Sequence, residues 1–230
     1  VMAAQNLWMY SIFDAYRSAR LMRHDEGYRY PISRESLGDL VVAPFSPSVL
    51  RSPWVWAGIP VMLGLAVGYT ALVSSDELSS PRTVFDGEGV NFLGRRYSTA
   101  PGLALGSAYL TGLFLPVGVG EEALFRGVIQ SSLMESFGPW GGFAAASLIF
   151  GGVHTLNFVN GEEQDVKTAV LAVPFITAVG SYLGYVYMQS EQQLARSVAL
   201  HFWYDVLLTG VGFLADPEHA PFVARFGTLW

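Results

Sequence analysis

Five apolar stretches, each about twenty residues long and almost free of charged side chains, recur along the chain. They cover residues 54–73, 100–120, 140–159, 168–188 and 197–215. A helix of that length rises about 30 Å, which is the thickness of the hydrocarbon core of a bilayer. Charged residues make up 14% of the 230 residues, whereas soluble domains usually carry about 25%. The pattern therefore predicts an all-α fold, a polytopic transmembrane helical bundle with about five long spans.

The remaining segments flank or connect these spans. Residues 1–23 mix aromatic, apolar and charged side chains, which predicts an amphipathic N-terminal helix that lies either at the lipid headgroups or against the bundle. Residues 28–53 contain four prolines and are predicted to form a connector that does not span the membrane. Polar sequence predicts loops at 74–99 and 160–167 and a short link at 190–196.

Positive charge collects near the N-terminus. The basic residues of this region are Arg17, Arg20, Arg23, Arg29, Arg34 and Arg51. The positive-inside rule places such a region in the cytoplasm or at the interface. We therefore divide the chain into this N-terminal region (1–53), a first span with its polar loop (54–99), a core (100–215) and a C-terminal tail (216–230).

Three charged residues stand close together at the start of the apolar segment 121–136, which is predicted to be a short intramembrane helix ended by residues 137–139. Glu121 and Glu122 are adjacent, and Arg126 follows Glu122 by one helical turn. The i,i+4 spacing lets Glu122 and Arg126 pair, while Glu121 points about 100° further round the helix. An ionised carboxylate at membrane depth costs several kcal/mol, so chains rarely keep one there without a use. The trio is either a structural clamp or part of a functional site, and function is the favoured interpretation.

Two of the four histidines lie inside apolar stretches. Gly151 and Gly152 come just before His154, with one residue between. Asp205 comes one helical turn after His201. Either histidine alone can simply hydrogen bond across helices. The two histidines, the two glutamates and Asp205 are five ionisable side chains on three predicted helices. Their burial costs the least free energy if they converge on one polar cavity. His24 and His219 lie in polar sequence and are expected at the surface.

This combination of side chains suits hydrolysis by water. A glutamate and a neutral histidine that share a water molecule act as a general base. A second histidine can donate to the oxyanion that forms when the water attacks a peptide carbonyl, and Asp205 can fix the tautomer of His201. The chain has no cysteine, and this chemistry needs neither a cysteine nor a serine nucleophile. The residues indicate hydrolysis of peptide bonds within the membrane.

The same residues resemble the motifs of the CAAX prenyl endopeptidase and bacteriocin-processing family (CPBP, or Abi) of intramembrane proteases. The first motif of that family is a pair of glutamates with an arginine four residues after the second, and Glu121, Glu122 and Arg126 match it. The second motif is a phenylalanine and a histidine four residues apart, which Phe150 and His154 match.

The third motif is a histidine followed four residues later by asparagine or a similar polar residue, and His201 and Asp205 match it. The resemblance covers about residues 100–215. It implies the helical bundle of the family, a water activated by Glu121 and His154, and an oxyanion stabilised by the third-motif pair.

One position departs from the eukaryotic prenyl-protein enzymes, which have asparagine where this chain has Asp205. An ionised aspartate cannot donate a hydrogen bond to an oxyanion. Asp205 must therefore be protonated, orient His201 or bind a cation, and orientation of His201 is the expectation.

The sequence thus predicts an intramembrane endopeptidase without metal or cofactor, located in a bacterial inner membrane. Its expected partners are the lipid bilayer and membrane-associated protein or peptide substrates. Nucleic acid is not expected, because the net charge of −6 gives no basic face.

Three alternatives stay open. The first is a metal-dependent membrane hydrolase with Glu121, His154, His201 and Asp205 as ligands, although the chain has no HExxH pair. The second is a non-catalytic protein of the same fold that acts in bacteriocin self-immunity or as a membrane scaffold. A transporter is the least favoured, because no internal repeat is found.

Overall fold

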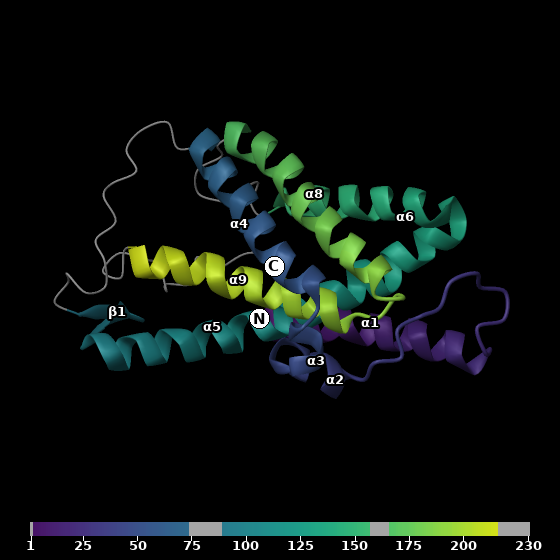
Figure 1. Ribbon diagram of the computed structural model, residues 1–230, viewed down its shortest axis with the longest axis horizontal. Helices are drawn as coiled ribbons and strands as arrows, with labels where there is room; N and C mark the ends of the chain where they lie inside the picture. Colours follow the sequence, from purple (N-terminus) through teal and green to yellow (C-terminus); the bar gives the residue numbers. More distant parts are fainter. Residues whose placement is uncertain (1, 74–88, 157–165, 216–230) are drawn as a thin grey trace.

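The computed structural model of the chain describes residues 2–73, 89–156 and 166–215. The predicted C-terminal tail, with His219, and parts of the two predicted polar loops lie outside these residues. The described chain is mostly helical, as predicted, and its helices pack into one bundle (Figure 1). In it, α5 (Thr99–Glu122) packs against α9 (Ala195–Ala215), α4 (Pro53–Val73) packs against α8 (Val166–Gln189) and α9, and α6 (Ser131–Val153) packs against α8.

The helices that carry or support the site are α1 (Met2–Met22), α5 (Thr99–Glu122), η2 (Ala123–Gln130), α6 (Ser131–Val153), α8 (Val166–Gln189) and α9 (Ala195–Ala215). The other elements are α2 (Leu37–Val42), η1 (Ala43–Phe45), α3 (Pro47–Leu50), α4 (Pro53–Val73), β1 (Val90–Phe92) and β2 (Arg95–Tyr97).

The predicted spans become helices, but their number as membrane spans is not confirmed. Among the residues that the structure describes, one helical stretch, Thr99–Val153, is long and apolar enough to cross a membrane, and Pro53–Leu65 is a shorter apolar helix. The prediction of five long spans therefore stays a prediction.

The segment with the charged trio is not a separate short helix. Helix α5 continues without a break into η2, which is a π-helix, and then into α6. Consequently the predicted span 100–120 and the predicted helix 121–136 form one rod. Such π-helical turns are rare and occur frequently at functional sites.

The predicted break at residues 137–139 is present inside α6. Gly138 has φ 75° and ψ 172°, a left-handed φ that glycine adopts without the steric cost of a Cβ. Pro139 follows it and has no N–H to continue the preceding helix. The chain turns back here, and the second part of α6 returns to the site (Figure 1).

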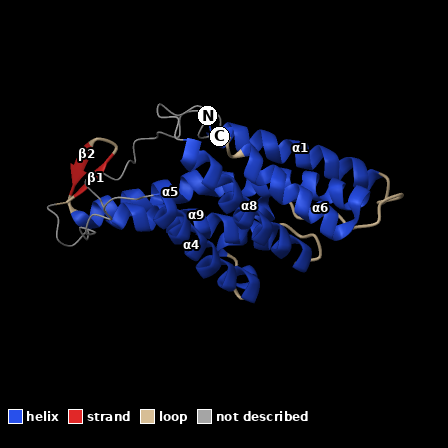
Figure 2. Ribbon diagram, turned by 90° about the horizontal axis from the view of Figure 1, so that it is seen from above, coloured by secondary structure: helices blue, strands red, loops and turns tan. Residues whose placement is uncertain are grey.

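The sequence did not indicate a short hairpin that the structure shows before α5. Strands β1 and β2 pair antiparallel, with Val90 opposite Tyr97. The hairpin lies at the end of α5 far from α6 (Figure 2), and Val90 of β1 is fully buried against Gly102 of α5.

Of the two placements considered for the N-terminal helix, the structure shows packing against the bundle. Phe13 of α1 is fully buried, and α1 contacts both α5 and η2. A Cβ at Gly120 would lie 2.5 Å from the backbone oxygen of Asn6, and one at Gly127 would lie 2.5 Å from the Phe13 ring. Helix α1 therefore lies directly on the rod that carries the two glutamates.

The connector 28–53, predicted not to span the membrane, contains three short helices. Helix α2 begins with a capping box, in which the Ser36 hydroxyl accepts from the Asp39 amide and the Asp39 carboxylate accepts from the Ser36 amide. Hydrogen bonds from the Ser36 side chain and backbone lower the pKa of Asp39. None of the three helices between Leu37 and Leu50 is long enough to span a bilayer.

Candidate active site

All the residues that the sequence singled out as catalytic lie in one connected cluster. They are Glu121 and Glu122 at the end of α5, Arg126 in η2, His154 at the end of α6, and His201 and Asp205 on α9. Glu122 is completely buried, and Glu121, Arg126 and His201 are each at most 6% exposed. Residues up to 84 positions apart along the chain thus share one polar site within an apolar bundle.

Both histidines face the carboxylate of Glu121. The Oε2 atom of Glu121 lies 3.6 Å from Nε2 of His154 and 3.9 Å from Nε2 of His201. This oxygen is buried and accepts no direct hydrogen bond from the described residues. The spacing is slightly too long for direct hydrogen bonds and short enough for one small polar molecule to contact all three groups.

The backbone sets the tautomer of His154. Its Nδ1 lies 2.7 Å from the carbonyl oxygen of Phe150. A carbonyl can only accept, so Nδ1 carries the proton and the neutral ring presents the Nε2 lone pair toward Glu121. His154 is therefore arranged as a base, and its ring is held by the backbone of its own helix.

Glu122 joins His201 to Arg126. Its Oε1 accepts a hydrogen bond from Nδ1 of His201 at 2.9 Å, and its Oε2 lies 3.3 Å from Nε of Arg126. The orienting bond to His201, which the sequence assigned to Asp205, is thus made by Glu122. Asp205 approaches the opposite side of the ring, with Oδ2 3.5 Å from Nε2.

Arg126 is fixed by two further contacts. Its Nη2 donates to the backbone oxygen of Gly180 on α8 at 2.9 Å. Its guanidinium carbon lies 4.4 Å from the centre of the Phe150 ring, and the same ring lies 4.4 Å from that of His154. Phe150 therefore packs against both a charged residue of the first motif and the histidine of its own motif.

Two residues that the sequence did not single out continue the contact between η2 and α8. Gln130 donates to the backbone oxygen of Gly184 at 3.1 Å, and the Ser131 hydroxyl lies 2.8 Å from that of Tyr187. Gln130 follows Arg126 by four residues, so its position one helical turn after the arginine was a usable signal.

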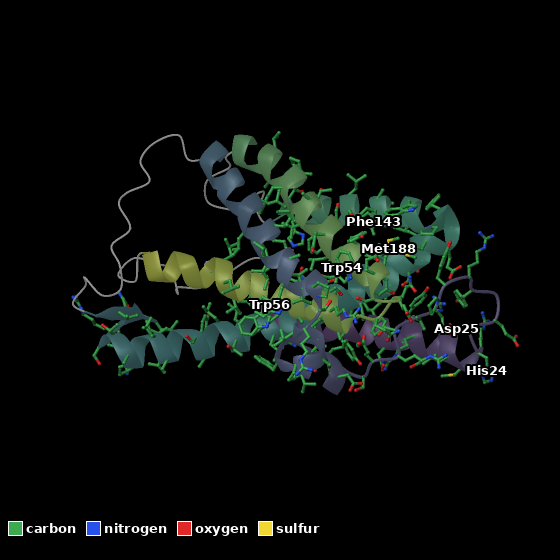
Figure 3. The ribbon with its side chains drawn as sticks, viewed as in Figure 1. His24, Asp25, Trp54, Trp56, Phe143 and Met188 are labelled. Atoms are coloured by element: carbon green, nitrogen blue, oxygen red, sulfur yellow. The ribbon has the colours of Figure 1, made fainter. Side chains whose placement is uncertain are left out.

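Remote polar residues take no part in the cluster. His24 is exposed, as predicted, and lies with Asp25 at the far end of α1 (Figure 3). In the part of the chain that the structure describes, no group of three or more histidine, aspartate or glutamate side chains is arranged to hold a metal ion.

Comparison with known proteins gives one match. Residues 103–207 match the family model for Rce1-like type II CAAX prenyl endopeptidases. This range contains every residue of the cluster. No curated protein and no solved structure matches the chain.

Proposed function

The chain belongs, over residues 103–207, to the Rce1-like family of type II CAAX prenyl endopeptidases, and from this premise we propose that it is an intramembrane endopeptidase. Its substrates are membrane-associated proteins or peptides, and its nucleophile is a water molecule. Multi-pass insertion and a bacterial inner membrane are part of the same proposal.

The approach of His154 to Glu121 carries this proposal. A lone-pair nitrogen and a buried carboxylate oxygen stand 3.6 Å apart, and they come from different helices of an apolar bundle. One water molecule can hydrogen bond to both, which is the arrangement a general base requires.

In the proposed reaction, Glu121 and His154 take a proton from the water as its oxygen attacks the carbonyl carbon of the scissile peptide bond. The C–N bond of the tetrahedral intermediate then breaks, and the proton passes to the departing amine. Such proton transfers typically contribute about 10²- to 10⁴-fold to the rate.

His201 supplies a hydrogen bond to the developing oxyanion. Its Nδ1 proton is committed to Glu122, so Nε2 carries a proton only when the ring is the imidazolium. The carboxylates of Glu122 and Asp205 flank the ring on opposite sides and favour a positive charge between them. A donor fixed in this way before the reaction needs little reorganisation.

Glu122 and Arg126 hold His201 in place. Their charges are fully buried and are matched to each other, and Arg126 is in turn bonded to α8. Asp205 lies on the Nε2 side of His201. As a carboxylate it favours the charged ring, and in its protonated form it would instead donate to the same oxyanion.

The test is cleavage of a peptide library and of a membrane-protein extract by protein reconstituted in liposomes, for wild type and Glu121→Gln, with and without a chelator. We expect cleavage by the wild type that resists the chelator and is lost in the variant. Loss on chelation would move the assignment to a metal-dependent hydrolase. Unchanged cleavage by Glu121→Gln would exclude the proposed base, and absence of any cleavage would favour self-immunity or a scaffold.

A further inference from the structure

The connector after α1 is attached to the rod that carries the two glutamates. Glu135 lies on α6 shortly after η2, and its carboxylate accepts hydrogen bonds from the amide of Arg29, at 2.9 and 3.1 Å, and from that of Tyr30, at 3.0 Å. These bonds join positions that are more than a hundred residues apart in the sequence.

The other end of the same connector is attached to α9. The carboxylate of Glu35 accepts from the amide of Leu194 at 2.5 Å and from that of Ala195 at 3.1 and 3.2 Å. Ala195 is the first residue of α9. The amides at a helix start lack partners within the helix and form the positive end of its dipole, so a carboxylate is well suited to bind them.

The segment between these two attachments is held against the protein. Ile32 and Ser33 are at most 1% exposed, and the Ser33 hydroxyl donates to the Glu35 carboxylate at 2.9 Å. Residues 29–35, which we call the strap, therefore connect two helices through a segment with little freedom to lengthen.

We propose that Glu35 is a positioning residue and that the strap fixes α9 relative to the rod that carries Glu121 and Glu122. The start of α9 precedes His201 by six residues, about 9 Å along the helix, so a shift at Ala195 moves the histidine. Its catalytic consequence rests on the proposed endopeptidase function. The strap itself lies outside the family match at 103–207, whereas both of its attachment points, Glu135 and Ala195, lie inside it.

The first test measures geometry and needs no substrate. Because the chain has no cysteine, spin labels can be placed at Ser136 on α6 and Leu208 on α9, which are both exposed. We expect a narrow distance distribution in the wild type and a broader or shifted one in Glu35→Ala. Glu26→Ala, at an exposed glutamate of the same connector, is the matched control and should leave the distribution unchanged. An unchanged distance distribution in Glu35→Ala would overturn the proposal that the strap fixes α9.

The second test measures turnover. Small displacements of catalytic groups reduce rates strongly, and we expect Glu35→Ala to lower kcat about tenfold with KM unchanged. Glu35→Gln keeps one acceptor oxygen that both amides can share, and it should recover most of kcat. A displaced α9 with unchanged kcat would overturn the positioning role. If the wild type cleaves nothing, the proposed function fails. The distance measurement still decides whether the strap fixes the position of α9.

Discussion

The His201 ring donates from Nδ1 to Glu122 across 2.9 Å, and this carboxylate also lies 3.3 Å from Nε of Arg126. One buried side chain thus orients a histidine on α9 and neutralises a guanidinium on η2. The carboxylate of Glu121, the adjacent residue, instead faces the Nε2 atoms of His154 and His201 at 3.6 and 3.9 Å. The two glutamates therefore have different environments, which suit a structural role for the second and a reactive role for the first.

Replacing Glu122 by leucine should reduce stability strongly. Arg126, which is 2% exposed, would keep its charge without a carboxylate beside it, and breaking a buried pair in this way typically costs about 3–5 kcal/mol. The measurement is the free energy of unfolding in detergent. The control is the double variant Glu122→Leu/Arg126→Met, which removes both charges and should recover much of the loss. Equal stability of the single and double variants would contradict a buried charge pair.

Replacing His154 by glutamine should reduce turnover without unfolding the protein. The side chain is only partly buried, and its Nδ1 bond goes to the backbone of its own helix. Loss of a general base typically lowers the rate by about 10²- to 10⁴-fold. The assay is kcat on whichever substrate the wild type cleaves, with His24→Gln as a matched control at an exposed histidine. Equal activity of the two variants would remove His154 from the reaction.

The convergence of the site residues was predictable from the sequence, because each physical cue was local. Uncharged runs indicated the helices, and the i,i+4 spacing paired Glu122 with Arg126, which the structure places 3.3 Å apart. The cost of burying separate ionisable groups favoured a single cluster. The sequence did not predict that Glu122 would bond Nδ1 of His201 while Asp205 approaches Nε2. Which carboxylate meets which nitrogen depends on how α9 is rotated relative to α5.

Contacts between segments far apart in the chain could not be predicted, because no local sequence pattern indicates them. Arg20 was counted among the cytoplasmic positive charges, yet it is 1% exposed, paired with Asp25 at 3.1 Å and stacked on Tyr28 at 3.8 Å. Glu35 reaches amides 159 and 160 residues further along the chain. The π-helical form of η2 was likewise not predicted from the sequence.

Replacing Gly120 by alanine should separate α1 from α5. A Cβ there would lie 2.5 Å from the backbone oxygen of Asn6, and a backbone atom cannot move aside as a side chain can. Overpacking of this kind typically costs about 1–3 kcal/mol. Gly112 lies in the same helix with nothing within 4 Å of its Cβ position, so Gly112→Ala should be neutral or slightly stabilising. Thermal unfolding in detergent compares the two, and equal midpoints would contradict the close approach of α1.

Replacing Asp205 by asparagine distinguishes the roles left open for this residue. If Asp205 donates to the oxyanion, it does so only when protonated, and the protonated fraction falls as the pH rises. An asparagine amide donates at every pH, so the ratio of kcat/KM in Asp205→Asn to that in the wild type should rise with pH. Asp205→Leu has no donor and should be slow throughout. The measurement is kcat/KM from about pH 5 to 9. A ratio independent of pH would show that Asp205 does not donate a proton and would leave it beside Nε2 of His201, 3.5 Å away, as a partner for the charged ring.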